Sequence, residues 1–230
     1  MQDRDVFFHA ILRDLGIEKG KPFEPTPKQE KLLMEAERVG YLMAINNAFK
    51  KRFEGARFYE DRRWYVALIN SPDQTQPTYG ELFERASWFH EAIGSTYAMK
   101  LEEPGPGSVY LGQYEDADGH GFAGGNTYTL DVPADVPAQQ FWALTVYDSH
   151  TRTIIRNDQR SAKVNSANEI VTNPDGTTTL YVGPEAPEAM ENNWIQIAEG
   201  QTWFAYFRLY DPKEAYFEKS WVLNDFVKRP

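Results

Sequence analysis

An acid and a histidine stand close together after one strongly patterned stretch, residues 141–148. Apolar side chains alternate through this stretch, which predicts a strand that ends at Asp148. Asp148 and His150 could act as acid and base on a bound substrate or an attacking water, which is the chemistry of a hydrolase. Asp148 is also explained as a turn cap that accepts backbone N–H bonds after the strand. Asp148 and His150 are therefore the catalytic candidates, and turn chemistry is the structural alternative.

Other patterns of catalytic or metal-binding residues are weak. The sequence has no cysteine, no Gly-x-Ser-x-Gly motif and no His-Glu-x-x-His motif, which excludes cysteine nucleophiles and thiolate metal sites. The histidines are scattered along the chain at His9, His90, His120 and His150. A convergence of His120 and His150 on Asp148 stays open, as does a glycosidase pair of Asp148 with Glu115. We predict no metal site and no cofactor.

A short acidic loop, residues 115–121, contains three acids next to glycine. Such a loop could bind calcium, but it matches only a fragment of an EF-hand loop and lacks the distal glutamate. Asp118-Gly119 is typical of a turn in which the glycine takes a positive φ. We therefore predict a turn here rather than a calcium site.

Aromatic, amide and arginine side chains around the predicted strands form the candidate ligand-binding set. In Asn192-Asn193-Trp194, an aromatic ring beside amides could stack on a sugar and hydrogen-bond its hydroxyl groups. Arg208 could bind a ligand, or it could form a structural ion pair with an acid such as Asp148. The candidate ligand-binding residues are Trp142, Tyr147, Asp148, Asn193, Trp194, Arg208 and Tyr210.

The composition of the chain excludes several classes of partner. Its 24 lysines and arginines face 34 acids, and the formal net charge of -10 repels phosphate backbones and anionic membranes. No apolar run approaches the ~20 residues that a membrane-spanning helix needs. Met1 leads directly into charged residues, so we expect no signal peptide there. We predict no nucleic-acid partner, no transmembrane segment and, if the chain is complete, a cytoplasmic location.

Helical periodicity dominates the first hundred residues. Residues 8–15 carry an apolar stripe at helical spacing. Thr26-Pro27-Lys28-Gln29 is a capping box that opens a long helix, and Thr78-Tyr79-Gly80-Glu81 is a second one. Pro104-Gly105-Pro106-Gly107 then interrupts the chain. These signals predict a helical subdomain over residues 1–104.

After Gly107 the hydrophobic period changes to two. The strand candidates are residues 109–113, 127–132, 139–148, 170–172, 177–182 and 201–210. Asn173-Pro174-Asp175-Gly176 predicts a hairpin turn between two of them. Successive strands without crossover helices favour antiparallel sheets. We therefore predict an α+β fold, in which residues 105–230 form an antiparallel β-sandwich of jelly-roll type.

Four segments resemble a known family in their order and spacing. They are Gly124–Asp131, Phe141–Asp148, Asn192–Trp194 and Arg208–Pro212. Together they resemble the domain-of-unknown-function family 1214, from about Gly105 to the C-terminus. The resemblance implies a jelly-roll sandwich preceded by a small helical subdomain. It implies no established reaction and no cofactor.

Members of that family usually follow a partner domain numbered 1254, in chains about twice this length. This sequence has no such upstream sandwich domain, so the resemblance implies either a fragment or a naturally short member. Many relatives look exported, which favours a periplasmic or extracellular location.

Three functions remain open from the sequence. The first is a binding module for a small molecule or glycan, with its site near Asp148, Trp194 and Arg208. The second is a hydrolase that uses Asp148 and His150. The third is a structural or self-assembling envelope or extracellular protein, in which aromatic strands pair between copies in a homo-oligomer. We adopt the first as the leading hypothesis.

Overall fold

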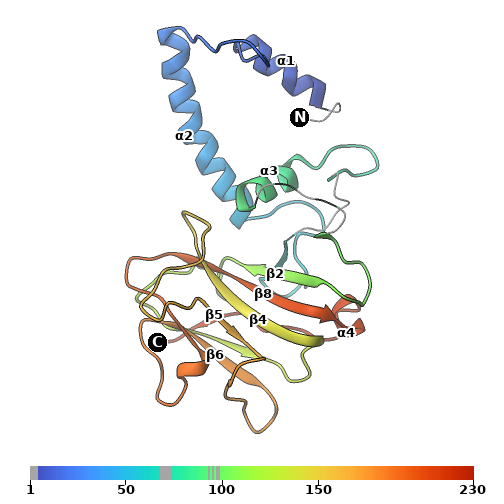
Figure 1. Cartoon of the computed structure of the whole chain (residues 1–230), viewed down its shortest axis with the longest axis vertical. Coiled ribbons are helices and arrows are strands. Elements are labelled where there is room, and N and C mark those ends of the chain that lie inside the picture. The colour runs from blue at the N-terminus through green and yellow to red at the C-terminus, as the bar shows by residue number, and fades with distance from the viewer. Residues whose placement is uncertain (1–4, 68–73, 93, 95, 97–98) are drawn as a thin grey trace. The chain divides into compact units, whose positions relative to one another are not determined.

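The computed structural model describes residues 5–67, 74–92, 94, 96 and 99–230. The chain divides into two compact units, Met1–Asn46 and Asn47–Pro230 (Figure 1). A domain boundary at residue 104 stays a prediction. In the described part of the chain, no helix combines the length and the apolar character needed to cross a membrane.

The predicted helices form, and one of the two predicted capping boxes is confirmed. In the first unit, α1 spans Val6–Asp14, and α2, Pro27–Phe49, begins there. The Thr26 amide donates to Gln29 Oε1 at 3.0 Å, and the Gln29 amide donates to Thr26 Oγ1 at 3.3 Å. These two bonds satisfy the backbone donors at the start of α2, as the capping box requires.

The second predicted capping box is wrong. Helix α3 begins at Leu82 and spans Leu82–Glu91, and its N-cap residue Glu81 makes no side-chain capping bond. The Glu81 amide donates instead to the Gln74 carbonyl at 2.8 Å. The capping box required the Glu81 amide to donate to the Thr78 side chain. Because this amide donates to Gln74, the box does not form.

The second unit contains two β-sheets. The five-stranded sheet is antiparallel throughout, in the order β1 (Tyr65–Val66), β2 (Ser108–Gln113), β8 (Trp203–Pro212), β4 (Ala138–Asp148), β5 (Lys163–Asn165). The four-stranded sheet has the order β7 (Trp194–Gln196), β6 (Thr178–Gly183), β3 (Tyr128–Val132), β9 (Val227–Lys228). Its β6–β7 pair is parallel, and its other pairs are antiparallel. Short helices are η3 (Glu191–Asn193) and α4 (Glu214–Phe217).

Residues 170–172 were predicted as a strand and are not one. The Val171 amide donates to Asn193 Oδ1, and the Val171 carbonyl accepts from Asn193 Nδ2, each at 2.8 Å. A side chain thus replaces the ladder partner that a strand would need. The predicted turn after this segment does form, because the Gly176 amide donates to the Asn173 carbonyl at 2.9 Å and Gly176 has a φ of 83°.

One hydrophobic core lies between the two sheets. The inward faces of β4 and β8 contribute to it, as their alternation predicts, and so do β3 and β6 of the other sheet. Core residues from these strands include Leu130, Trp142, Leu144, Leu180, Trp203 and Phe207. The mixed fold with a helical N-terminal part and antiparallel sheets is confirmed. The sheets are not closed, and jelly-roll connectivity stays a prediction.

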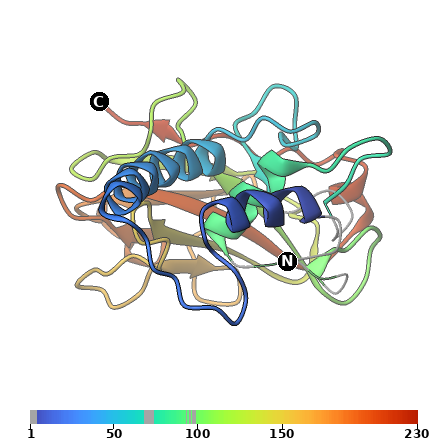
Figure 2. The same cartoon turned by 90° about the horizontal axis from the view of Figure 1, so that it is seen from above.

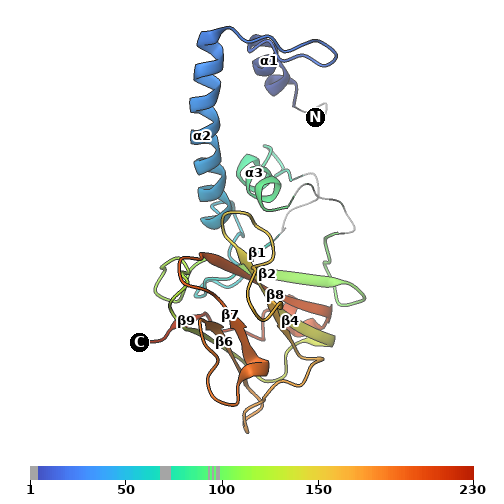
Figure 3. The same cartoon turned by 60° about the vertical axis from the view of Figure 1, so that its left-hand side comes forward.

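A second, smaller cluster lies on the outer face of the five-stranded sheet. Helix α3 lies over β2 and β8 (Figures 2 and 3). Trp88 of α3 packs there with Tyr114, Phe204 and Tyr206, together with residues Phe53 and Tyr65. The outer face is therefore partly covered, and its uncovered part is where the candidate site lies.

Candidate functional site: an arginine among tyrosines beside an apolar cavity

Arg208 lies in the middle of the outer face of the five-stranded sheet. The register of β8 pairs Arg208 with Tyr110 of β2 on one side and with Ala143 of β4 on the other. Because side chains alternate between faces, Thr145 and Tyr147 of β4 point to the same side as Arg208. The Arg208 guanidinium donates to Thr145 Oγ1 at 2.7 Å and to the Tyr147 hydroxyl.

Tyrosine rings surround the guanidinium. Its central carbon lies 4.8 Å from the ring centroid of Tyr110, 5.6 Å from that of Tyr147 and 5.7 Å from that of Tyr206. These are distances at which a cation is attracted to an aromatic face. Burial acts to lower the pKa of Arg208, but the hydrogen bond with Tyr147 and the neighbouring tyrosine hydroxyls raise it above its ordinary value. The side chain is therefore charged.

In the described part of the chain, Arg208 forms no ion pair with a carboxylate. The side chains that act most strongly on its pKa are tyrosines and not carboxylates. Its two hydrogen bonds use neutral hydroxyl acceptors, and a guanidinium has five N–H donors. A half-buried cation with unused donors is a ready site for a carboxylate or phosphate group.

A buried polar cluster lies next to this site, under α3. Glu91, at the end of α3, forms an ion pair with Lys51, and both side chains are 1% exposed. The hydroxyls of Tyr114 and Tyr206 both donate to Glu91 Oε1. A charged pair this deeply buried is tolerated only when further hydrogen bonds complete it, and the two tyrosines supply them.

Gly112 of β2 makes room for this cluster. A Cβ atom at Gly112 would come within 2.8 Å of the Tyr114 hydroxyl and 3.0 Å of the Tyr206 ring. The missing side chain lets both hydroxyls reach Glu91. The cluster thus ties α3 to the sheet beside Arg208.

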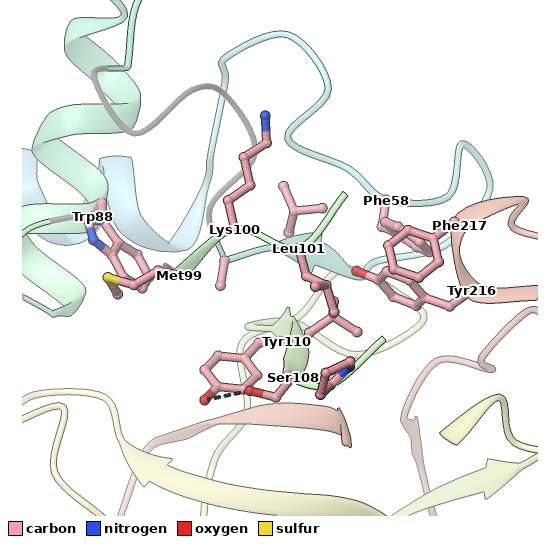
Figure 4. A pocket seen from close by; sticks show the side chains of 14 residues that line it. Phe58, Trp88, Met99, Lys100, Leu101, Ser108, Tyr110, Tyr216 and Phe217 are labelled. Carbon is pink, nitrogen blue, oxygen red and sulfur yellow. Dashed lines mark hydrogen bonds between the residues drawn. The ribbon is translucent and has the colours of Figure 1, made fainter. Parts of the chain in front are cut away.

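A cavity of about 480 Å³, lined mostly by apolar residues, is bordered by Tyr110 (Figure 4). Phe58, Tyr216 and Phe217 lie together on one side of it, and Trp88 and Met99 lie on the other. Its remaining lining residues are Val66, Ala67, Lys100, Leu101, Pro106, Gly107, Ser108, Val109 and Tyr110. The volume is within the range of small-molecule sites.

Asp148 caps a turn, as its structural alternative predicts. Asp148 Oδ1 accepts hydrogen bonds from the His150 amide at 3.0 Å, the Thr151 amide at 2.7 Å and Thr151 Oγ1 at 2.9 Å. Partial burial acts to raise the pKa of Asp148, but these bonds lower it below its ordinary value. His150 is exposed. The turn accounts for the position of Asp148, and its use in catalysis stays a prediction.

The ion pair of Asp148 with Arg208, which the sequence left open, does not form. The register places Asp148 opposite Trp203, whereas Arg208 lies opposite Ala143. Five residues of extended strand separate the two positions, which is roughly 17 Å. The register between β4 and β8 sets this separation, and the register cannot be predicted from the sequence alone.

The other predicted binding residues divide into two groups. Tyr210 shares the outer face with Arg208 and Tyr147, and its ring stacks on Phe141 with the centroids 4.1 Å apart. Trp142 lies in the core and stacks on a phenylalanine of β8, Phe207. The structure therefore brings Tyr147, Arg208 and Tyr210 to one surface.

Asn193 and Trp194 lie by the four-stranded sheet and make backbone contacts. The buried Asn193 amide bonds both backbone groups of Val171 and the Thr179 carbonyl. Trp194 Nε1 donates to the Gly183 carbonyl at 3.0 Å. These bonds hold the loop onto β6 and do not join either residue to Arg208.

The acidic loop adopts the predicted turn. Gly119 has a φ of 85°, and Asp116 Oδ1 accepts from the amides of Asp118 and His120. In the described part of the chain, one group of potential metal ligands lies within 4.8 Å of one another, Asp116, Asp118 and His120. His120 does not converge with His150 and Asp148 in this group, and no metal is assigned to it.

Comparison with known proteins identifies the segment that contains Arg208 and the tyrosines around it. Residues 107–214 match the family model described as "Protein of unknown function (DUF1214)". The chain is similar to that family over this segment, which is called the DUF1214 domain below. The family's predicted pairing with an upstream 1254 domain stays a prediction. No curated protein matches the chain.

Two solved structures are similar to the chain that contains this DUF1214 domain. The VPA0106 protein from Vibrio parahaemolyticus has a TM-score of 0.51 and 18% identity, over 99% of this chain and 52% of that protein. An uncharacterised protein from Burkholderia cenocepacia has a TM-score of 0.39 and 16% identity, over 72% and 47% of the two chains. The first likeness concerns the fold alone, and this chain spans about half the length of that protein.

Several residues of the site in and around the DUF1214 domain were missed by sequence reasoning. Tyr206 could have been found, because it alternates with Phe204, Arg208 and Tyr210 on one strand face. Tyr110 lies in a predicted strand, but no neighbouring motif in the sequence indicates that it belongs to a site. No local pattern distinguishes Lys51 or Glu91 from surface charges, because their burial depends on α3 packing against the sheet.

Proposed function

We propose that the DUF1214 domain of this chain is a binding module for a small molecule that carries an anionic group. The half-buried charge of Arg208, which has no carboxylate partner among the described residues, supports this proposal. A bound carboxylate would supply the missing countercharge and accept the remaining guanidinium N–H bonds. Tyr110 and Tyr147 flank that position and offer ring faces.

The surrounding rings favour a ligand with a flat or apolar part. Tyr147 and Tyr210, two members of the predicted binding set, lie on the same sheet face as Arg208. Aromatic faces pack against the apolar faces of sugar rings and against other aromatic rings. An acidic sugar and an aromatic acid are therefore both candidates, and a jelly-roll arrangement of the two sheets remains part of the proposal.

Replacing Arg208 with glutamine is expected to weaken the binding of anionic ligands by about 10- to 100-fold, since a hydrogen bond to a charged group contributes about 1.5–3 kcal/mol. Isothermal titration calorimetry with benzoate and galacturonate measures this loss. Arg208→Lys keeps the charge but not the planar fork, so an intermediate affinity is expected. Benzyl alcohol and galactose, the neutral counterparts, should bind equally to the wild type and Arg208→Gln.

The matched control is Arg156→Gln, which changes an exposed arginine outside the site. This variant should bind both anions like the wild type. Saturable binding that is unchanged in Arg208→Gln, or no binding of any anion, would contradict the proposal. Thermal denaturation of each variant separates lost binding from lost folding.

Self-association is a second candidate function, favoured by the exposed side chains of the helical unit. Leu32, Val39 and Met43 recur at helical spacing on α2 and are 54%, 54% and 59% exposed. Phe7 of α1 and Met34 of α2 are more exposed still. Apolar residues gathered in this way are typical of a surface that another protein surface covers.

The purified chain is therefore expected to form dimers or larger oligomers at micromolar concentration. A Leu32→Glu, Met43→Glu double variant should shift it to a monomer, because each change puts a charge into the apolar contact. Sedimentation velocity over a concentration series measures the shift. A control that changes the exposed Lys31 to glutamate keeps the apolar stripe. A wild-type chain that stays monomeric at about 100 µM would rule out this function.

A further inference from the structure

We infer that the ligand is an amphipathic acid, whose anionic group binds Arg208 and whose apolar chain or ring occupies the cavity beside Tyr110. This inference rests on the proposed function and adds the class of ligand. Arg208 alone does not require a ligand with an apolar part, and the cavity alone does not require an acid. The chemistry of the cavity and the position of Tyr110 together carry it.

The cavity offers an apolar occupant many aliphatic and aromatic side chains, and two of its polar side chains, Ser108 and Lys100, already have partners. Ser108 Oγ donates to the Tyr110 hydroxyl at 3.3 Å. Lys100 forms an ion pair with Glu102 at 2.5 Å, and its ammonium points away from the rest of the lining in Figure 4. Most of the remaining lining is aliphatic or aromatic. Burial of apolar ligand surface is therefore the main gain that this cavity offers.

Tyr110 joins the cavity to the anionic position. Its ring lines the cavity and lies 4.8 Å from the Arg208 guanidinium carbon. The β2–β8 register makes the two residues direct neighbours, so the backbone holds them at this separation. A ligand that reaches around the Tyr110 ring could bind Arg208 and fill the cavity. Neither a purely polar anion nor a neutral hydrocarbon would use both.

The size of the cavity limits the apolar part. About 480 Å³ is at the lower end of the range for drug-sized ligands, which is roughly 300–1,000 Å³. A medium-length alkyl chain or a pair of rings fits such a volume, whereas a long acyl chain would extend into solvent. Affinity should therefore rise with chain length and then level off.

Titration calorimetry with straight-chain carboxylates from butanoate to decanoate, and with the matching alcohols, tests the inference. We expect affinity to rise about fourfold for each added methylene, which is about 0.8 kcal/mol of transfer free energy, and then to reach a plateau. Arg208→Gln should weaken every acid by a similar factor and leave the alcohols unchanged. Leu101→Trp, which fills the cavity, should flatten the dependence on chain length but keep butanoate binding.

Leu42→Trp is the matched control, because it adds the same ring at an exposed position of α2. A second measurement tests the cavity without the Leu101→Trp substitution. Bromooctanoate should quench tryptophan fluorescence in the wild type, and Trp88→Phe should remove the quenched component because Trp88 lines the cavity.

The outcomes separate this inference from the proposed function. Acids that bind through Arg208 with equal affinity at every chain length would overturn the amphipathic ligand and leave the anion-binding module standing. A chain-length dependence that survives in Leu101→Trp, or quenching that survives in Trp88→Phe, would place the apolar part elsewhere and overturn it too. No binding of any acid would remove both.

Discussion

Replacing Glu91 with glutamine is expected to lower the free energy of unfolding by about 3–5 kcal/mol, because it leaves the ammonium of Lys51 buried without a countercharge. The side chains of Lys51 and Glu91 are each 1% exposed, so water cannot replace the lost partner. The tyrosines at Tyr114 and Tyr206 also lose a charged acceptor for their hydroxyl bonds. Urea denaturation followed by circular dichroism measures the loss.

A double variant, Lys51→Met with Glu91→Gln, should recover much of that stability. It removes both charges, and a buried pair replaced by uncharged groups is often nearly neutral in stability. Glu102→Gln is the matched control, since it breaks a solvent-exposed ion pair with Lys100 and should leave the urea midpoint unchanged. If Glu91→Gln and Glu102→Gln unfold at the same urea concentration, the buried pair does not stabilise the unit.

Stability is expected to fall steeply as the pH rises above 10. Burial raises the pKa of Tyr59 to about 12, and it also raises the pKa values of Tyr114, Tyr206 and Tyr216. In Tyr114 and Tyr206 the charge of Glu91 adds to this effect. An unfolded chain loses these protons near pH 10. Folding therefore keeps the four hydroxyls protonated at a pH where the unfolded chain is ionised.

The direction of the pH dependence follows from proton uptake. Above pH 10 the folded state binds more protons than the unfolded state, so the free energy of unfolding decreases with pH, by about 1.4 kcal/mol per pH unit for each fully linked tyrosine. Below pH 10 both states hold these protons, and the contribution is fully present. Stability is lost as the pH rises through the folded-state pKa values.

Tyr216→Phe should reduce this slope without a large loss at neutral pH, because it removes one buried hydroxyl and keeps the ring. Tyr79→Phe is the control, since Tyr79 is 53% exposed. Urea midpoints measured from about pH 9 to about pH 11.5, an interval that contains the unfolded-state pKa, give the slopes. Identical slopes for the wild type and Tyr216→Phe would show that its burial does not shift its ionisation.

Local chemistry determined most of the secondary structure. Thr26 and Gln29 form a capping box because both partners lie within one turn of the same helix. The alternation in β4 and β8 predicted which side chains face the core, because a strand turns successive side chains to opposite faces. The motifs over residues 124–212 also predicted the DUF1214 family.

Local signals failed where a distant group competed for the same atoms. The Glu81 amide donates to the Gln74 carbonyl instead of the Thr78 side chain. The Val171 amide donates to the side chain of Asn193 instead of to a neighbouring strand. In both places the local pattern was correct as a tendency. A partner outside the local window offered a better hydrogen bond, and a single sequence does not show which distant residue will arrive.

By itself, the sequence determined five of the six strands it predicted, the inward faces of β4 and β8, the turn at Asp148 and the presence of Arg208 on an aromatic strand face. Only the tertiary structure decided that Arg208 lies beside Tyr110 rather than Asp148, and that Lys51 and Glu91 meet under α3. The physical reason is strand register and helix packing. Both are set by contacts between residues far apart in the chain, and a shift of register would give the same side chains different neighbours.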